Sequence, residues 1–347
     1  IIIFNLKLIV INLFNMKSLD AILDNIQQNN FLIIGRAGID IYPDPPGTKT
    51  ENAKKFVTHL GGSSANIGVA LTKLGGKCHL LTCVSEDALG RLAINQLNHY
   101  GVDTSLVRYV KGESRISFAI VETTIKDHQS IIYRNNAADL EMSKEDVNKF
   151  DYKKFSSIIV TGTSLAAEPS RSATLEALNT AKKNNLAIIL DIDYRPYTWR
   201  SLQEASRIYL KVAEICDIVI GNDDEFAVMA ENYSDGIKLA EKLSKSTASI
   251  VIYKMGEKGS ITFTENEKIK TGIFQVDALK PTGAGDAFMG VFISSLLNKK
   301  SIKDSVIDGS AAAAIVVTKV GCSPAMPSKE ELELFLKKNM ITNFKDN

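Results

Sequence analysis

Short apolar runs separated by helical segments are the feature that most constrains how this chain can fold. Six runs rich in Ile and Val lack the strict alternation of a half-exposed strand, which predicts strands covered on both faces: 31–35, 78–84, 156–162, 186–192, 217–221 and 249–254. Helical segments lie between them, for instance 86–100, 168–184 and 201–215. Repeated strand–helix units predict an α/β fold with a doubly wound, mainly parallel sheet.

Two regions interrupt this repeat. Residues 36–60 contain three prolines, and residues 115–134 alternate apolar and polar side chains around a polar turn near Lys126, which is typical of a hairpin. We expect strands from these regions to form a small β lid that keeps water away from a reacting ligand. Since neither repeats nor low-complexity linkers occur, residues 31–340 are expected to form one domain.

The beginning of the chain has a different composition. Residues 1–15 are apolar but contain Asn5, Lys7 and Asn12, and the segment is short for a membrane span. A basic start and a small-residue cleavage site, which a signal peptide needs, are both missing. Met16 fits a translation start, and we expect residues 1–30 to be an extension outside the fold.

Composition argues for small-molecule ligands. The 347 residues carry a formal net charge of +1, which gives no electrostatic reason to expect nucleic acid or an anionic membrane as a partner. The four cysteines and four histidines show no metal-ligand or catalytic-triad spacing. Scattered cysteines of this kind are typical of reduced thiols, so we expect a cytoplasmic protein.

Residues 280–290 carry the most specific chemical signal. A Gly-rich turn there precedes an apolar segment that is typical of a buried helix. Because Gly283 has no side chain to cover the backbone, the amides of Ala284 and Gly285 at the helix start are accessible and favour an anion. A carboxylate in such a place is expected when it takes a proton from a hydroxyl that attacks phosphorus, so Asp286 is the candidate general base. These residues alone leave open an ordinary loop with an N-capping Asp.

A second Gly-rich motif, Gly-Gly-Ser-Ser-Ala-Asn at 61–66, precedes a predicted helix. Either serine of the motif is expected to cap that helix. Gly61 and Gly62 let a small ligand approach the backbone closely, and Asn66 offers a donor and an acceptor to a hydroxyl. Taken alone, a glycine pair before a helix is more often a simple turn.

In their order and separation, the two motifs resemble the paired signatures of the ribokinase-like (PfkB) sugar kinases. The resemblance implies ATP as phosphoryl donor and Mg²⁺ as cofactor, with Asp286 as base and the glycine turn as anion cradle. Asn222 and Glu225 match the family's Asn-x-x-Glu motif, which implies a place around Mg²⁺ and phosphate through water. An acid-rich helix start is the alternative for this motif.

The same resemblance implies a nucleotide path along the later part of the chain. Lys254, Gly256 and Gly259 correspond to a strand and turn beside the nucleotide, and Ser310 lies where ribose kinases carry an adenine-side Asn. Lys280 is a departure, because ribose kinases have an Asp there that is associated with a monovalent cation. We expect the Lys280 ammonium group to replace that cation, which would make activity insensitive to added K⁺.

Substrate preference is suggested by an early acid and by two arginine motifs. Asp40 matches the family's Asp that holds sugar hydroxyls. Tyr133 and Arg134 end the lid hairpin, Asp193 and Arg195 follow a predicted strand, and both pairs are expected to face the sugar. Because Arg suits a carboxylate, these arginines suggest a sugar acid. Pairing of each Arg with a neighbouring acid is the alternative.

Longer strings, such as 35–40 and 193–199, are similar to a branch of the family that phosphorylates the C6 hydroxyl of a keto-deoxy sugar acid. Alternatives are a kinase of 2-keto-3-deoxygluconate, a fructokinase or ribokinase and, from another class, a non-catalytic sugar-binding regulator. A dinucleotide-dependent oxidoreductase is disfavoured because no Gly-x-Gly-x-x-Gly follows the first strand. Lids in this family often pack between subunits, which would fit a homo-oligomer.

Overall fold

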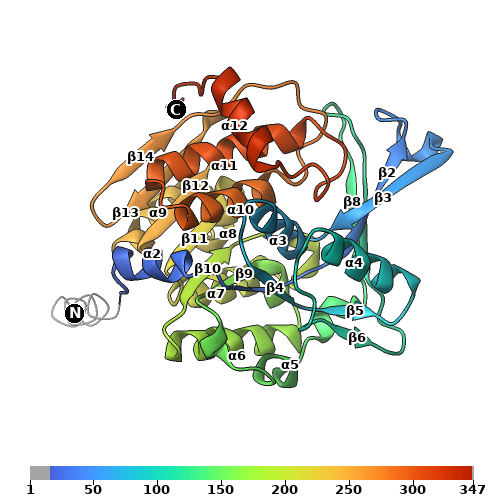
Figure 1. Ribbon diagram of the computed structural model, residues 1–347, viewed down its shortest axis with the longest axis horizontal. Coiled ribbons are helices and arrows are strands. Elements are labelled where there is room, and N and C mark those ends of the chain that lie inside the picture. The colour runs from blue at the N-terminus through green and yellow to red at the C-terminus, as the bar shows by residue number, and fades with distance from the viewer. Residues whose placement is uncertain (1–15, 346–347) are drawn as a thin grey trace.

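The protein is built around a mainly parallel sheet, seen in a computed structural model that describes residues 16–345 (Figure 1). Its strands are β1 (Phe31–Ile34), β4 (Cys78–Leu81), β9 (Ser157–Thr161), β10 (Ala187–Asp191), β11 (Ile218–Asn222), β12 (Ile250–Lys254), β13 (Ser260–Thr264) and β14 (Lys268–Thr271). They lie in the order β14-β13-β12-β11-β10-β9-β1-β4, and only the pairs that involve β13 are antiparallel. The doubly wound sheet is confirmed, and so are the six predicted strands, except that the run 78–84 leaves the main sheet after Leu81. The strands β13 and β14 are not predicted.

Helices cover both faces of this sheet. They are α2 (Leu19–Gln27), α3 (Ser63–Lys73), α4 (Ala88–His99), α5 (Lys144–Asn148), α6 (Ser170–Lys183), α7 (Leu202–Ala213), α8 (Asp223–Ala230), α9 (Gly236–Ser244), α10 (Ala284–Leu297), α11 (Ile302–Val317) and α12 (Lys329–Lys338). Along β1, Phe31 and Ile33 pack into the core under α3, α10 and α11, while Leu32 and Ile34 pack into the core under α6 and α7. Two cores explain why the strands lack polar alternation.

A smaller sheet stands beside the main one, at the right of Figure 1. It consists of β2 (Gly38–Asp44), β3 (Lys55–Gly61), β7 (Ser117–Val121) and β8 (Ser130–Tyr133), in the order β3-β2-β7-β8. These strands come from the two regions that the sequence analysis set apart as a lid. A short parallel pair, β5 (Cys83–Ser85) and β6 (Arg108–Val110), completes the strands of the described chain. Within residues 16–345, no helix is long and apolar enough to cross a bilayer.

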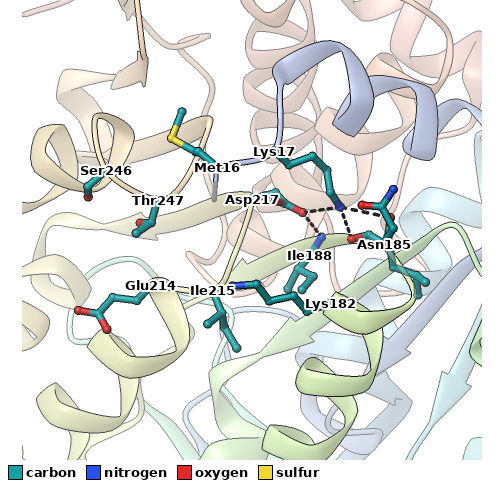
Figure 2. Close-up of a pocket in the computed structure, with 11 residues that line it drawn as sticks. Met16, Lys17, Lys182, Asn185, Ile188, Glu214, Ile215, Asp217, Ser246 and Thr247 are labelled. Carbon is teal, nitrogen blue, oxygen red and sulfur yellow. Dashed lines mark hydrogen bonds and ion pairs between the residues drawn. The ribbon is translucent and has the colours of Figure 1, made fainter. Parts of the chain in front are cut away.

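The N-terminal boundary expected at residue 30 is wrong, because the chain joins the fold before that point. The Lys17 ammonium group donates to the backbone oxygen of Asn185 at 3.2 Å and lies 3.4 Å from Asp217, as Figure 2 shows. In α2, Ile22 and Ile26 are fully buried in the main core. Their helical spacing with Leu19 and Leu23 was a readable signal. Residues 1–15 lie outside the described residues.

We expect Ile22→Ala to destabilise the protein by about 2–5 kcal/mol, because it leaves a cavity between α2 and the core. Urea unfolding measured by circular dichroism would detect the change. Asp24→Ala, at an exposed position of the same helix, is the matched control and should change stability by less than about 0.5 kcal/mol. Equal stability of the Ile22→Ala variant and the native chain would show that α2 is not part of the cooperative fold.

Candidate active site

A cavity of about 230 Å³ lies where the main strands end and the small sheet begins. Such a position, beyond the carboxyl ends of parallel strands, is where open α/β sheets bind ligands. Most of the predicted site residues line it: Asp40, Gly62, Asn66, Asp193, Arg195, Asn222, Glu225, Lys254, Gly283, Gly285 and Asp286. The structure therefore brings both Gly-rich motifs into one site, although they lie far apart in the sequence.

The first turn of α10 forms one wall of the cavity. Gly283 precedes the helix with φ of 86°, a conformation that favours glycine, and a Cβ there would lie 2.8 Å from the Cys322 sulfur. The helix behind this turn is buried almost throughout, as expected from its sequence. Because the first amides of a helix have no carbonyl partner within it, the amides of Ala284, Gly285 and Asp286 are available to an anion.

The Asp286 carboxylate is held by a hydrogen-bonded relay from α3. The Asn66 side-chain amide donates to Asp286 Oδ2 at 2.8 Å, and the buried Ser323 hydroxyl donates to Asn66 Oδ1 at 2.6 Å. An ionised carboxylate can only accept, so Asn66 presents its NH₂ group to Asp286, and its oxygen is left to accept from Ser323. The two helices come close because Gly290 of α10 faces Ala70 of α3, where a Cβ would approach the Ala70 Cβ to 2.5 Å. The sequence carried no signal for Ser323.

The acidity of Asp286 differs from that of an ordinary aspartate. Burial, and then the nearby negative charge of Asp193, raise the pKa of Asp286 to about 6. The Asn66 hydrogen bond and the charges of Arg195 and Arg36 act in the opposite direction. At neutral pH the group is still mostly ionised, and its pKa is closer to that of an efficient general base.

Glycines let the wall of the cavity close tightly around Asp40. A Cβ at Gly61 would lie 2.0 Å from Asp40 Oδ1, and a Cβ at Gly62 would lie 2.5 Å from the Arg36 backbone oxygen. Asp40 accepts a hydrogen bond from the Tyr42 hydroxyl at 3.3 Å. Burial raises the pKa of Asp40, and the charge of Arg36 opposes that shift.

The start of α3 is not capped as the sequence predicts. Gly62 is the residue that precedes the helix, with φ of 93° and no side chain to cap it. Ser63 and Ser64 instead lie inside the first turn, and their hydroxyls bond to Thr161 at the end of β9. The two serines thus fasten α3 to the main sheet, since Thr161 lies on a central strand.

Tyr133 and Arg134 do not line the cavity as the sequence analysis expects. Because side chains alternate along β8, Ser130 and Ile132 face the cavity, and Tyr133 stacks on Phe118 instead. Arg134 is buried in an ion pair with Asp139 and donates to the Thr163 backbone oxygen at 2.9 Å. The alternative pairing considered for this arginine is therefore the one found.

Arg195 does line the cavity, but a neighbouring acid already contacts it. Its guanidinium lies 2.7 Å from Asp193 Oδ1 and also donates to the Tyr194 backbone oxygen at 2.9 Å. The carboxylate of Asp193 raises the pKa of Arg195 above its usual value. Asp193 has φ of 40°, an uncommon conformation for a residue other than glycine, and within the described chain its second oxygen is buried without a partner.

At the end of β11, Asn222 and Glu225 form a reciprocal cap at the start of α8. Asn222 Oδ1 accepts from the Glu225 amide at 2.8 Å, and Glu225 Oε2 accepts from the Asn222 amide at 2.7 Å. Glu225 Oε1 accepts from the Tyr194 amide at 3.2 Å. Asn222 and Glu225 therefore cap a helix start, which is the alternative that the sequence analysis gave for this motif. Both residues also line the cavity.

Asp191 and Lys254 also line the cavity, and neither the Asp191 carboxylate nor the Lys254 ammonium group has a polar partner in the described part of the chain. Burial raises the pKa of Asp191 well above its ordinary value, opposed by the Lys254 charge and reinforced by Asp193 and Glu225. The Lys254 nitrogen would lie 3.5 Å from a Cβ at Gly285, beside the first turn of α10. The sequence analysis did not assign Asp191 a role.

Three predicted nucleotide residues lie away from the cavity lining. Gly256, with φ of 54°, and Gly259, with φ of 101°, belong to the turn between β12 and β13, and a Cβ at Gly259 would lie 2.1 Å from the Thr271 backbone oxygen. Ser310 lies half-buried in α11. In residues 16–345, no cluster of three or more His, Cys, Asp or Glu side chains is arranged to hold a metal ion.

Lys280 is buried beneath the turn that leads into α10. Its side chain has no solvent exposure, and the ammonium group donates to the backbone oxygens of Thr282 at 2.6 Å and Val316 at 3.4 Å. Burial lowers the pKa of Lys280, while Cys322, Asp40 and Asp286 oppose that shift. Two backbone oxygens around a buried positive charge are the kind of environment that also suits a small cation.

The sequence matches a family model described as pfkB family carbohydrate kinase over residues 28–329. A 5-dehydro-2-deoxygluconokinase from Photobacterium profundum is 39% identical over 310 residues, which cover 88% of this chain and 94% of that protein. The chain therefore belongs to the PfkB family of carbohydrate kinases, and the resemblance inferred from its motifs is confirmed.

Solved structures agree on the fold. An E. coli protein solved in complex with ATP and Mg²⁺ matches with a TM-score of 0.79 and 22% identity, covering 89% of this chain and 99% of that one. A fructokinase double mutant from Vibrio cholerae, solved with fructose, ADP and a potassium ion, matches with a TM-score of 0.76 and 23% identity, covering 89% and 98%. At these identities the likeness shows a shared ribokinase-like fold.

We expect Asp286→Asn to stabilise the protein increasingly as pH rises. Because the pKa of Asp286 is about 6 in the folded state and 3.8 is its ordinary value, the folded state holds the proton more tightly between those values. Native stability therefore falls as pH rises through this window, and the uncharged variant escapes that loss. Its advantage should grow by about 1–3 kcal/mol between about pH 4 and pH 7.

Urea unfolding of both proteins across this range would measure the difference. Asp24→Asn, which removes an exposed carboxylate of α2, is the control and should show no such growth. A constant difference between Asp286→Asn and the native chain at all pH values would mean that Asp286 has an ordinary pKa.

Proposed function

We propose that the protein is an ATP-dependent kinase of a sugar acid, which transfers the γ-phosphoryl group to the C6 hydroxyl of 5-dehydro-2-deoxy-D-gluconate. The observation that carries this proposal is the Asp286 carboxylate, held by Asn66 at 2.8 Å beside the free amides of the α10 start. The name of the relative with 39% identity supports the choice of acceptor. Four buried free cysteines support a cytoplasmic location.

In this proposal Asp286 accepts the proton of the acceptor hydroxyl as its oxygen attacks the γ-phosphorus. The amides of Ala284 and Gly285 stabilise the negative charge on the transferred phosphoryl oxygens, and the Lys254 ammonium group beside Gly285 adds a further positive charge. The small sheet, through Ala119 and Ile132, covers the acceptor and excludes water.

The residues on the nucleotide side fit a metal held through water and phosphate. Within residues 16–345 the Asp191 carboxylate has no partner, while the oxygens of Asn222 and Glu225 already accept backbone hydrogen bonds. Direct ligation by all three is therefore disfavoured, and Asp191 is the carboxylate most available to a hydrated ion. When bound, Mg²⁺ would supply neutralisation of the phosphate charges.

Phosphoryl transfer from ATP with Mg²⁺ to a panel of acceptors tests the proposal. We expect 5-dehydro-2-deoxygluconate to have a higher kcat/KM than 2-keto-3-deoxygluconate, fructose and ribose. Asp286→Asn should lower kcat by about 10²–10⁴-fold, because it removes the proton acceptor while leaving the cavity shape unchanged. Equal or better turnover of fructose or ribose would overturn the acceptor assignment, and brisk turnover by Asp286→Asn would exclude this base.

We further propose that the Lys280 ammonium group makes the enzyme independent of monovalent cations. Native kcat should change less than about twofold when K⁺ replaces an equal concentration of choline. Lys280→Ala should lose roughly tenfold or more in kcat, since the turn before α10 loses its buried charge, and added K⁺ or NH₄⁺ should restore part of it. Choline holds ionic strength constant. A steep K⁺ dependence of native kcat would refute the proposal.

A further inference from the structure

We propose that Arg36 binds the carboxylate of the acceptor and gives the site its preference for sugar acids over neutral sugars. The inference rests on the proposed function, because it names the chemical group that separates the two acceptor classes. Arg36 follows β1 and lines the same cavity as Asp40 and Asp286. It was not among the site residues identified from the sequence.

The Arg36 guanidinium is almost wholly buried yet has little to bind in the described part of the protein. The side chain is 7% exposed, and its Nη1 donates to the Ser117 hydroxyl at 3.3 Å. The Nε atom is buried without a partner. Within residues 16–345, no carboxylate lies within ion-pair distance of it. A guanidinium has five N–H donors, so most of its binding capacity is unused.

The other arginines near the site are already paired. Arg195 lies 2.7 Å from Asp193, so a substrate carboxylate placed on it would also meet a buried acid. Arg134 is paired with Asp139 and does not line the cavity. A planar guanidinium can bind a carboxylate through two parallel hydrogen bonds, and Arg36 is the cavity arginine best placed to do so.

One acceptor molecule can reach both Arg36 and Asp286, because both side chains line the same cavity. In an open-chain sugar acid the carboxylate and the C6 hydroxyl are at opposite ends, so Asp286 and the carboxylate-binding group must contact different ends of one acceptor. Ser117, the protein partner of Arg36, belongs to β7 of the small sheet. Arg36 therefore lies where the main sheet meets the lid, and an acceptor bound to it lies against both. Its charge also reaches Asp40 and Asp286, where it acts to lower the pKa of each.

The test compares two acceptors that differ only at this group: 5-dehydro-2-deoxygluconate and its neutral analogue with a hydroxymethyl group in place of the carboxylate. Arg36→Met should raise KM for the acid by about 10- to 100-fold, the range expected when a charged group loses its hydrogen bonds. Its kcat should change much less, and kcat/KM for the neutral analogue should fall far less than kcat/KM for the acid, because the neutral analogue senses only the loss of the Arg36 charge near Asp40 and Asp286. Ser117→Ala, which removes the hydrogen-bond acceptor of Arg36, is the control and should affect both acceptors little.

The outcomes separate this inference from the proposed function. If the native enzyme does not phosphorylate the acid, the proposed function fails. If the native enzyme prefers the acid but Arg36→Met weakens both acceptors equally, Arg36 only holds the lid and the inference alone fails. If Arg36→Met unfolds at a lower temperature than the native protein, the same two acceptors are compared with the Arg36→Lys variant. It keeps the charge without the planar fork, so an acid-specific rise in KM supports the inference and an equal rise for both acceptors overturns it.

Discussion

The contact between Asn66 and Asp286 is the interaction on which the rest of the site depends. It joins two helices across 220 residues of sequence, and it exists only because glycine and alanine let α3 and α10 approach closely. The start of α10 also carries the free backbone amides, and the start of α3 carries the glycine turn beside Asp40. The packing of this helix pair therefore sets the positions of the Asp286 carboxylate, the free amides and the glycine turn relative to one another.

Five carboxylates line the cavity and make its electrostatic potential negative. Asp40, Asp191, Asp193, Glu225 and Asp286 all line it, and burial raises the pKa of four of them. Such a group of acids is unfavourable until cations or hydroxyl groups enter. Three positive side chains, those of Arg36, Arg195 and Lys254, line the same cavity and offset part of this negative charge. A cation or a hydroxyl donor that enters the cavity would relieve the remaining repulsion between the carboxylates.

The sequence predicted those features that depend on local pattern, including the six core strands, the lid segments, and the glycine turns around Asn66 and Asp286. It could not predict contacts that tertiary packing decides. Ser323 orients Asn66 across 257 residues, and no local motif marks it. Arg134 looked like Arg36 in sequence, since both follow a strand, yet one pairs with Asp139 and the other contacts the Ser117 hydroxyl. The helix α2 was overlooked because its short apolar stripe follows an unusual N-terminal segment.

The hairpin of β2 and β3 begins and ends at the site, since Asp40 lies near its start, Gly61 is the last residue of β3 and Gly62 follows it. Its tip, residues 45–54, projects away from these anchors. The tip is bonded to the loop after β7, through the Gly47 amide on Thr123 and through Lys49 and the Thr50 amide on Glu122, so changes that keep these bonds should leave the anchors in place. A scaffold of this kind can acquire new acceptor preferences or subunit contacts while inheriting its phosphoryl-transfer machinery intact.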